Sequence, residues 1–440
     1  MASQTAPSIK QQQNPNPKNL THMKKTLLLS LALLTGTGIL AQKAINIGGI
    51  IYILNPSDST ATVYSGENCS GDIIIPETVE DGDITYQVTS IDANAFYQNE
   101  EITSVSIPST MKSIGQAAFA YCIDLTTVGI PNSVTSIGKY AFYNCTSIDH
   151  IVIPNSVTSI GEMAFYNCTG LTSIAIPNSV KKMEWGTFHS CTSLSFVNAD
   201  NVESIESYAF YGCTGLETVF LGNTLKNIGE YAFYGCSGLT ELFIPGSVTD
   251  IGPYAFAYTG LTSLTIPESV TIIKEGVFLD CSGLTELTIP NSVTSIDKFA
   301  FSYIIGLTSL TIPESVTDIG IAAFRDCSGL TSLTIGNSVT SLGELAFYGC
   351  DDIKDVTFLT KKPFAISSDV FSCQDKATLH VQKDLIPTFG ELEGWKDFSS
   401  IKDASDPDDE DPAKIMDTNR DGDVNSADVV RIYNYIITGE

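Results

Sequence analysis

The sequence predicts a repeat solenoid, an elongated stack of short and similar coils. A phenylalanine recurs at intervals of 22 or 23 residues along most of the 440-residue chain. The unit Leu307–Gly329 (LTSLTIPESVTDIGIAAFRDCSG) is followed at Leu330 by a near copy, LTSLTIGNSVTSLGELAFYGC. A period of this size marks a solenoid, because one such unit cannot bury its apolar face without its neighbours. The anchor residues are Phe96, Phe119, Phe142, Phe165, Phe188, Phe210, Phe233, Phe256, Phe278, Phe301, Phe324 and Phe347.

The first half of the unit predicts a short strand. Leu310 and Ile312 are two residues apart, so they point to the same face of a strand. Ser309 and Thr311 then face outward. Pro313 has no backbone donor and ends strand pairing there.

The second half predicts a further inward run and a turn. Val316 and Ile319 point inward, and the Ala323-Phe324 pair is expected to place its ring in the core on a short helical turn. Gly320 would allow a bend with positive φ. Other coils carry charged residues at this position, which argues against a conformation that only glycine adopts: Asp92, Glu206, Lys274 and Asp297.

These residues resemble the leucine-rich repeat, and specifically the bacterial BspA-like class, which reads L-x-x-I-x-I-P-x-x-V-x-x-I-G-x-x-A-F-x-x-C. The match covers roughly Ile73–Phe371. The resemblance implies a right-handed, curved leucine-rich-repeat horseshoe of short β-strands, turns and short helical turns. It also implies a bacterial surface protein that adheres to other molecules.

The composition is strongly acidic. Acidic residues number 50 against 23 basic ones, a net charge of −27. Loss of a leader that holds four lysines and no acidic residue would make it −31. Such a chain repels nucleic acid and anionic membrane surfaces.

The eleven cysteines allow two interpretations. A disulfide or metal ladder is one, and a column of small buried side chains is the other. The second is favoured, because Asn99, Thr259 and Ile304 replace the cysteine in three coils and parallel Cβ vectors fit a disulfide poorly. No Cys-x-x-Cys pair supports a zinc site. Nine cysteines lie three residues after the anchor: Cys122, Cys145, Cys168, Cys191, Cys213, Cys236, Cys281, Cys327 and Cys350.

Residues 1–42 are interpreted as a leader. From Met23 the sequence reads MKKTLLLSLALLTGTGILAQ, in which two lysines precede an apolar run. A small residue near its end, Ala41, offers a cleavage site. This is the pattern of a secretory signal peptide, 23–42, and is too short to be a spanning helix. Residues 1–22 then read as a start-site artefact. We therefore expect a secreted or cell-surface chain with no transmembrane segment after processing.

The remaining boundaries follow the repeat. Residues 43–101 are expected to form a β-rich N-terminal cap and first coil, and 102–373 the leucine-rich repeats. Residues 374–402 include Trp395 and Phe398 and are expected to form the C-terminal cap. The acidic stretch 403–416 reads as a linker.

The segment 417–440 contains a calcium-loop pattern. Oxygen side chains fall at loop positions 1, 3, 5, 9 and 12, glycine stands at position 6, and position 7 would offer its backbone carbonyl. Calcium is the expected cofactor, and the alternative is a solvated acidic tail. The expected ligands are Asp417, Asn419, Asp421, Asp423, Asn425 and Asp428.

Aspartate at position 12, followed by the apolar helical pattern VVRIYNYII and Gly439, resembles a type I dockerin repeat. The resemblance implies docking to a cohesin-type module. A dockerin uses two such repeats, and this chain carries one.

The sequence contains no recognisable catalytic motif. Only His150, His189 and His380 remain after the leader, and no nucleophile elbow, phosphate loop or zincin helix occurs. A carboxylate pair for glycoside hydrolysis is compatible with the spacing, but nothing singles one out. We expect a protein that is not an enzyme.

A binding face is expected instead on the outward strand positions. Most of them carry Thr or Ser, but Phe220 and Phe243 occupy the same outward position in adjacent coils. Phe196 and Glu241 lie nearby, with His150 two coils earlier. Exposed aromatics with a polar rim are typical of binding hot spots, although a cross-strand stack that only stabilises the sheet fits as well.

Three functions therefore stay open. The first is adhesion to a host or microbial surface protein or glycan. The second is an accessory protein tethered to a cohesin-bearing scaffold by its calcium-binding tail. The third is a structural surface-layer component.

Overall fold

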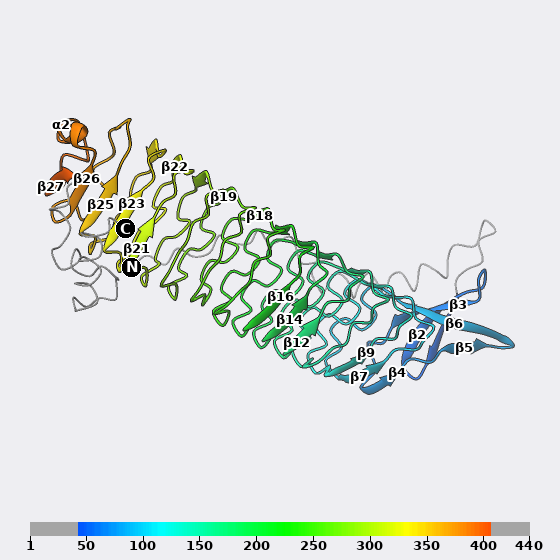
Figure 1. Ribbon diagram of the computed structural model, residues 1–440. Coiled ribbons are helices and arrows are strands. Elements are labelled where there is room, and N and C mark those ends of the chain that lie inside the picture. Colours follow the sequence, from blue (N-terminus) through cyan, green and yellow to red (C-terminus); the bar gives the residue numbers. More distant parts are fainter. Residues whose placement is uncertain (1–42, 406–440) are drawn as a thin grey trace, which may run out of the picture.

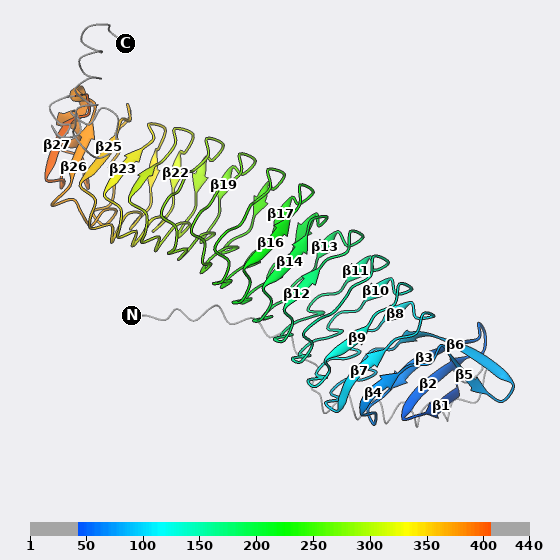
Figure 2. The ribbon, with the colours of Figure 1, turned by 60° about the horizontal axis from the view of Figure 1, so that its bottom comes forward.

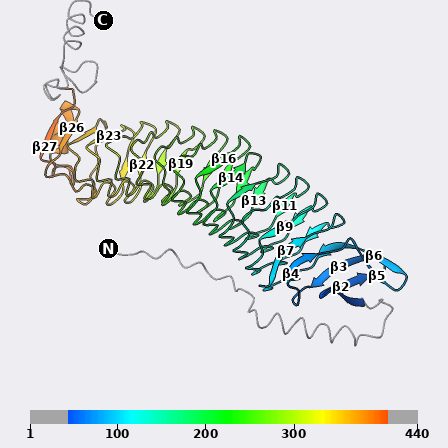
Figure 3. The same ribbon diagram turned by 90° about the horizontal axis from the view of Figure 1, so that it is seen from below.

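The computed structural model describes residues 43–405, which form one elongated stack of coils. The solenoid that the period predicts is confirmed: it has about 15 turns and almost no helix. Its blue N-terminal end and its orange C-terminal end lie far apart (Figure 1). Seen from below, the body bends gently between these ends (Figure 3).

Each coil has three sides, and the first side contributes to a row of parallel strands that we call the first strand row. Leu310 and Ile312 are buried while Ser309 and Thr311 are exposed, which confirms the predicted alternation. The row comprises β4 (Gly71–Ile74), β7 (Ile102–Ser106), β9 (Thr127–Gly129), β12 (Ser173–Ala175), β14 (Phe196–Ala199), β16 (Thr218–Leu221), β21 (Ser309–Thr311), β23 (Ser332–Ile335), β25 (Asp355–Phe358), β26 (Thr378–Val381) and β27 (Ser400–Asp403).

The first strand row is not one continuous sheet. It consists of three sheets, β4-β7-β9, β12-β14-β16 and β21-β23-β25-β26-β27. In the gaps between these sheets, the isolated bridges are His150↔Ser173 and Thr265↔Thr288. The sequence predicts a strand in every coil, so this interruption is a difference from expectation.

The second side of each coil carries a strand, of two residues in all coils but the first, and these strands form the second strand row. Its inward residues, such as Ile319, are buried. Figure 2 shows the two rows side by side along the body, β12, β14 and β16 in one and β13 and β17 in the other. The row comprises β6 (Ile84–Ile91), β8 (Ser113–Ile114), β10 (Ser136–Ile137), β11 (Ser159–Ile160), β13 (Lys182–Met183), β15 (Ser204–Ile205), β17 (Asn227–Ile228), β18 (Asp250–Ile251), β19 (Ile272–Ile273), β20 (Ser295–Ile296), β22 (Asp318–Ile319) and β24 (Ser341–Leu342).

The third side is a run of tight turns, so the expected helical turn at Ala-Phe is wrong. In the coil of Phe119, Ala117 and Tyr121 have positive φ, 51° and 63°. The amide N–H of Phe119 donates to the carbonyl of Ala141 in the next coil at 2.8 Å rather than to its own coil. A helical turn would direct these donors along its own axis, whereas here they join neighbouring coils.

The anchor rings form a continuous internal stack, which confirms that they fill the core. Adjacent rings from Phe96 to Phe371 are 5.0 to 5.7 Å apart between centroids and nearly parallel. Ring planes differ by only 9° between Phe233 and Phe256. The rings are buried, so they supply much of the apolar area that holds the coils together.

The position of Gly320 has a packing explanation. Gly320 is not among the residues with positive φ. A Cβ built on it would lie 2.5 Å from the backbone nitrogen of Lys298 in the preceding coil. Glycine is used here for close approach between coils, in agreement with the prediction that no glycine-only conformation is required.

The cysteine column consists of buried free thiols, as favoured from the sequence. All eleven cysteines are free and buried. The Sγ of Cys122 donates to the carbonyl of Phe96 in the preceding coil at 3.1 Å, and the other eight cysteines that follow an anchor repeat this contact. Burial raises the pKa of Cys213 to about 12, so its reactive thiolate form is suppressed.

The N-terminal end is closed by a β-rich cap. β1 (Lys43–Ile47), β2 (Ile50–Asn55) and β3 (Thr60–Ser65) form an antiparallel meander, and β3 pairs in parallel with β6. β5 (Thr78–Asp81) and β6 form a hairpin around Gly82, whose φ is 63°. Antiparallel strands here end the stack without exposing the first ring, Phe96.

The C-terminal end is closed by aromatic rings over the last coil. Trp395 packs against Phe371 at 5.7 Å and its indole N–H donates to the carbonyl of Phe364 at 2.8 Å. Phe389 and Phe398 are buried beside it. The helical segments in 43–405 are η1 (Lys383–Leu385) and α2 (Ile386–Phe389).

Candidate functional site

The candidate binding face is the outward side of the first strand row. Phe196, Phe220 and Phe243, which we call the phenylalanine patch, all lie on it and are 37%, 51% and 70% exposed. The pairing of β14 with β16 sets Phe196 opposite Thr218 and Asn198 opposite Phe220. The structure therefore brings the three predicted rings to one surface in three consecutive coils.

The first two rings of the patch contact each other. The ring of Phe196 meets that of Phe220 edge to face, with centroids 5.6 Å apart. Such a pair stabilises two neighbouring strands by about 0.5–1.5 kcal/mol. Stabilisation of the sheet therefore explains in part why aromatic rings occur at these two exposed positions.

Phe243 differs from the other two rings. It is the most exposed of the three, and among residues 43–405 no ring contact involves it. Leu239–Ile244 is not assigned a strand, although Leu242 and Ile244 remain buried. Sheet stabilisation does not explain an exposed phenylalanine here. Glu241 is exposed two residues earlier on the same outward side.

His150 lies at the N-terminal margin of this face. It is exposed and forms a bridge with Ser173. Ser173 lies one coil before Phe196, and His150 lies two coils before it. Val152, which the sequence analysis did not single out, occupies the coil position equivalent to Phe220 and is 63% exposed. Alignment of the outward positions coil by coil would have found it.

A second aromatic feature, the tyrosine ladder, covers the turn side and was also missed. Its rings are mostly half-buried and contact their neighbours at centroid distances of 4.5 to 5.6 Å. Desolvation is the main cause that raises the pKa of Tyr234 to about 12. Because stacked rings cover each other's faces, this ladder mainly stabilises the coil stack. Its members are Tyr97, Tyr121, Tyr143, Tyr166, His189, Tyr211, Tyr234 and Tyr258.

His189 is the single imidazole of this ladder. It is buried between Tyr166 and Tyr211, with centroids at 4.5 and 4.6 Å. Its Nδ1 lies 2.8 Å from the hydroxyl of Ser190, and its Nε2 has no hydrogen-bond partner among the described residues. Burial lowers the pKa of His189 to about 4, so the ring is neutral at pH 7.

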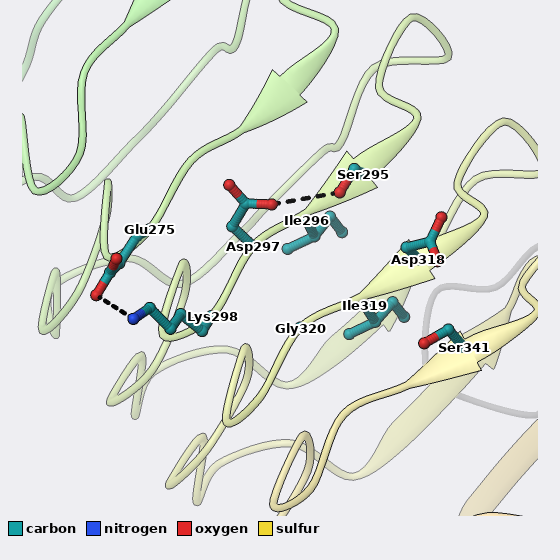
Figure 4. A pocket seen from close by; sticks show the side chains of 9 residues that line it. All are labelled: Glu275, Ser295, Ile296, Asp297, Lys298, Asp318, Ile319, Gly320 and Ser341. Atoms are coloured by element: carbon teal, nitrogen blue, oxygen red, sulfur yellow. Dashed lines mark hydrogen bonds and ion pairs between the residues drawn. The ribbon is translucent and has the colours of Figure 1, made fainter.

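A shallow groove crosses the second strand row at β20, β22 and β24 (Figure 4). Its volume is about 290 Å³, at the lower limit for small-molecule sites. Lys298 is paired with Glu275 at 3.1 Å, and the Ser295 hydroxyl donates to Asp297 at 3.3 Å. No histidine or cysteine lines the groove.

Residues 43–405 hold no candidate metal site and no candidate membrane span. No three histidine, cysteine, aspartate or glutamate side chains within this range are grouped so that they could hold a metal ion. No helix within the same range is long and apolar enough to cross a membrane. The leader 1–42, the greater part of the linker 403–416, and the calcium-loop residues from Asp417 to Asp428 lie outside the described residues.

Comparison with protein families matches the chain to the BspA type leucine-rich repeat region, over residues 89–201, 187–304 and 294–390. These ranges cover well over half of the chain. The protein belongs to the BspA-type leucine-rich repeat family. Comparison of this BspA-type protein with curated proteins gave no match.

A solved structure of a similar protein has the same architecture, and two further solved structures are similar in sequence. A leucine-rich repeat protein from Bacteroides ovatus is 28% identical, covers 77% of this BspA-type chain and 100% of its own, with a TM-score of 0.55. A leucine-rich cell surface protein from Faecalibacterium prausnitzii is 27% identical and covers 83% of this chain and 96% of its own, with a TM-score of 0.49. A leucine-rich repeat protein of Treponema pallidum is 30% identical over 45% of this chain and 91% of its own, with a TM-score of 0.40. The overlap with the Bacteroides ovatus protein supports the leucine-rich-repeat solenoid.

Proposed function

We propose that this BspA-type protein is a non-enzymatic binding protein of the bacterial surface or secreted space. In this proposal the phenylalanine patch on the first strand row contacts a protein or glycan of a host or of another microbe. The observation that carries it is Phe243, an apolar ring that is 70% exposed. Exposed aromatic residues in a polar surround are what interface hot spots use.

The leader and the repeat architecture support the same proposal. Residues 23–42 have the pattern of a secretory signal peptide. Stacked coils also place equivalent outward positions side by side, which makes one extended surface that can contact a large partner.

The test is a double variant, Phe220→Ser with Phe243→Ser. We expect it to abolish retention of the protein on a panel of immobilised extracellular matrix proteins and glycans. Both side chains are exposed, so the midpoint of thermal unfolding should stay within a few degrees of the wild type.

The matched control is Ile272→Ser with Ile305→Ser. These two side chains are 45% and 53% exposed and lie away from the patch. The control should bind as the wild type does. Normal binding by the Phe220→Ser, Phe243→Ser variant would refute the proposed face.

The calcium-loop pattern supports a second proposal, that residues 417–440 bind calcium and attach the protein to a cohesin-type module. Its support is the order of oxygen side chains at loop positions 1, 3, 5, 9 and 12. The two proposals are compatible, because one concerns target binding and the other attachment.

A further inference from the structure

The first strand row carries charge of one sign over most of its length. From Thr103 to Thr334 no outward position of this row holds lysine or arginine. Exposed carboxylates occur instead at Glu217 and Glu241, within the coils of the phenylalanine patch, and at Glu286, two coils beyond Phe243. None of these three takes part in an ion pair within residues 43–405.

The basic residues of the same coils lie on the other two sides, and most are neutralised there. Lys182 pairs with Glu184 at 3.0 Å and Arg325 with Asp326 at 3.0 Å. The ion pairs Lys139–Glu162, Lys274–Asp250 and Lys298–Glu275 follow the same pattern. All basic residues between 102 and 353 are Lys112, Lys139, Lys181, Lys182, Lys226, Lys274, Lys298 and Arg325.

We propose that the partner of the phenylalanine patch is a basic polypeptide segment, in which lysine or arginine alternates with apolar side chains. This inference rests on the proposed function and names the class of partner. Charge complementarity carries it, because unpaired carboxylates on a binding face attract cations and reject anionic partners.

The aromatic rings and the carboxylates suit the same occupant. A lysine or arginine head over the exposed face of Phe243 gains a cation–π contact, and its apolar stem covers the ring. Glu241 lies two residues away on the same side, about 7 Å along the chain, within reach of the next basic side chain. A neutral glycan would leave these carboxylates unused.

The experiment uses the full chain and three sets of synthetic 15-residue peptides. The sets share the same leucine and phenylalanine content and carry net charges of about +5, 0 and −5, chosen to span the electrostatic contrast. We expect the basic set to bind best, with affinity falling as salt rises from low to physiological concentration. Phe220→Ser with Phe243→Ser should remove this binding.

A triple variant tests the carboxylates directly. Glu217→Gln, Glu241→Gln and Glu286→Gln together should weaken binding of the basic peptides by about tenfold, given the modest strength of each exposed ion pair. The matched control, Glu203→Gln, Glu230→Gln and Glu344→Gln, removes the same charge from exposed positions on other sides. It should change affinity less than twofold, within the scatter of surface substitutions.

Three results would overturn the inference: best binding by neutral or acidic peptides, equal loss in the two triple variants, or no binding of any peptide set. If a glycan is held through Phe220 and Phe243 while the peptides are not, the proposed function stands and only this inference fails. If the Phe220→Ser, Phe243→Ser variant keeps its binding to both glycans and matrix proteins, the proposed function and this inference are both refuted.

Discussion

At the scale of single residues, the backbone of each coil depends on two positions whose conformation is not evident from the sequence. The residues two before and two after each anchor adopt positive φ, as Tyr231 (55°) and Gly235 (70°) do around Phe233. Such a conformation costs a non-glycine residue on the order of 1 kcal/mol. Hydrogen bonds to the next coil offset it, from Tyr231 N to Pro253 O at 3.0 Å and from Gly235 N to Ala257 O at 2.9 Å.

One residue-scale prediction concerns His189 and pH. Its folded pKa of about 4 lies below the usual 6.5, because burial disfavours the charged ring. As pH falls from 6.5 to 4, the unfolded chain binds a proton that the folded chain does not. The contribution of neutral His189 to stability is therefore present above pH 6.5 and is lost toward pH 4, by about 3 kcal/mol.

The measurement compares the wild type with His189→Tyr, the residue that flanking coils carry at this position. The free energy of unfolding of both proteins is measured in urea at pH 7 and at pH 4. Because both proteins carry the same carboxylates, the contribution of these groups cancels in the difference between them. The variant should lose less stability on acidification. A difference between the two proteins that does not change with pH would contradict the prediction.

At the scale of the element, the coil could be predicted from the sequence in part. The period and the alternation of Leu310, Ser309 and Thr311 sufficed for the stack, the inward rings and the outward threonines. They could not distinguish a helical turn from a β-turn at Ala323-Phe324, because one turn contains too few residues for a period. The choice depends on hydrogen bonds to the next coil, such as Phe324 N to Ala346 O at 2.8 Å.

The element-scale prediction concerns the ring stack. Phe233 is fully buried between Phe210 and Phe256, with centroids at 5.1 and 5.4 Å. Phe233→Ala should cost about 3–5 kcal/mol of unfolding free energy through lost burial and a cavity. Phe233→Leu fills most of the space and should cost clearly less. Equal costs for the two variants, in urea unfolding followed by circular dichroism, would show that the ring stack does not matter.

At the scale of the whole molecule, the three sides of the coils carry different kinds of side chains. The turn side holds the tyrosine ladder, and the first strand row holds the phenylalanine patch with its carboxylates. The lysines between residues 102 and 353 lie in the second strand row or within two residues of its strands. Phe196, Phe220 and Phe243 could be predicted from the sequence because strand alternation assigns them outward. Val152 and the charge asymmetry could not, since they become visible only when every coil is aligned to its three sides.

The last prediction concerns the C-terminal segment and separates attachment from target binding. Calcium added to the full chain should release or absorb heat in calorimetry, with an affinity between about 10⁻⁷ and 10⁻³ M as for calcium loops. Asp417→Ala with Asp421→Ala removes two of the expected ligands and should abolish the heat. Asp408→Ala with Asp409→Ala, in the linker, removes equal charge and should leave it unchanged.

Deletion of residues 417–440 extends the same test to function. If the segment serves attachment, the shortened chain keeps its binding to targets through Phe220 and Phe243 but is no longer retained by a cohesin-type module in the presence of calcium. Because a site that forms on folding couples ion binding to stability, a chelator should reproduce the loss of retention in the full chain. Retention that survives both the deletion and the chelator would place attachment elsewhere in the molecule, and no heat with millimolar calcium would leave residues 417–440 as a solvated acidic tail.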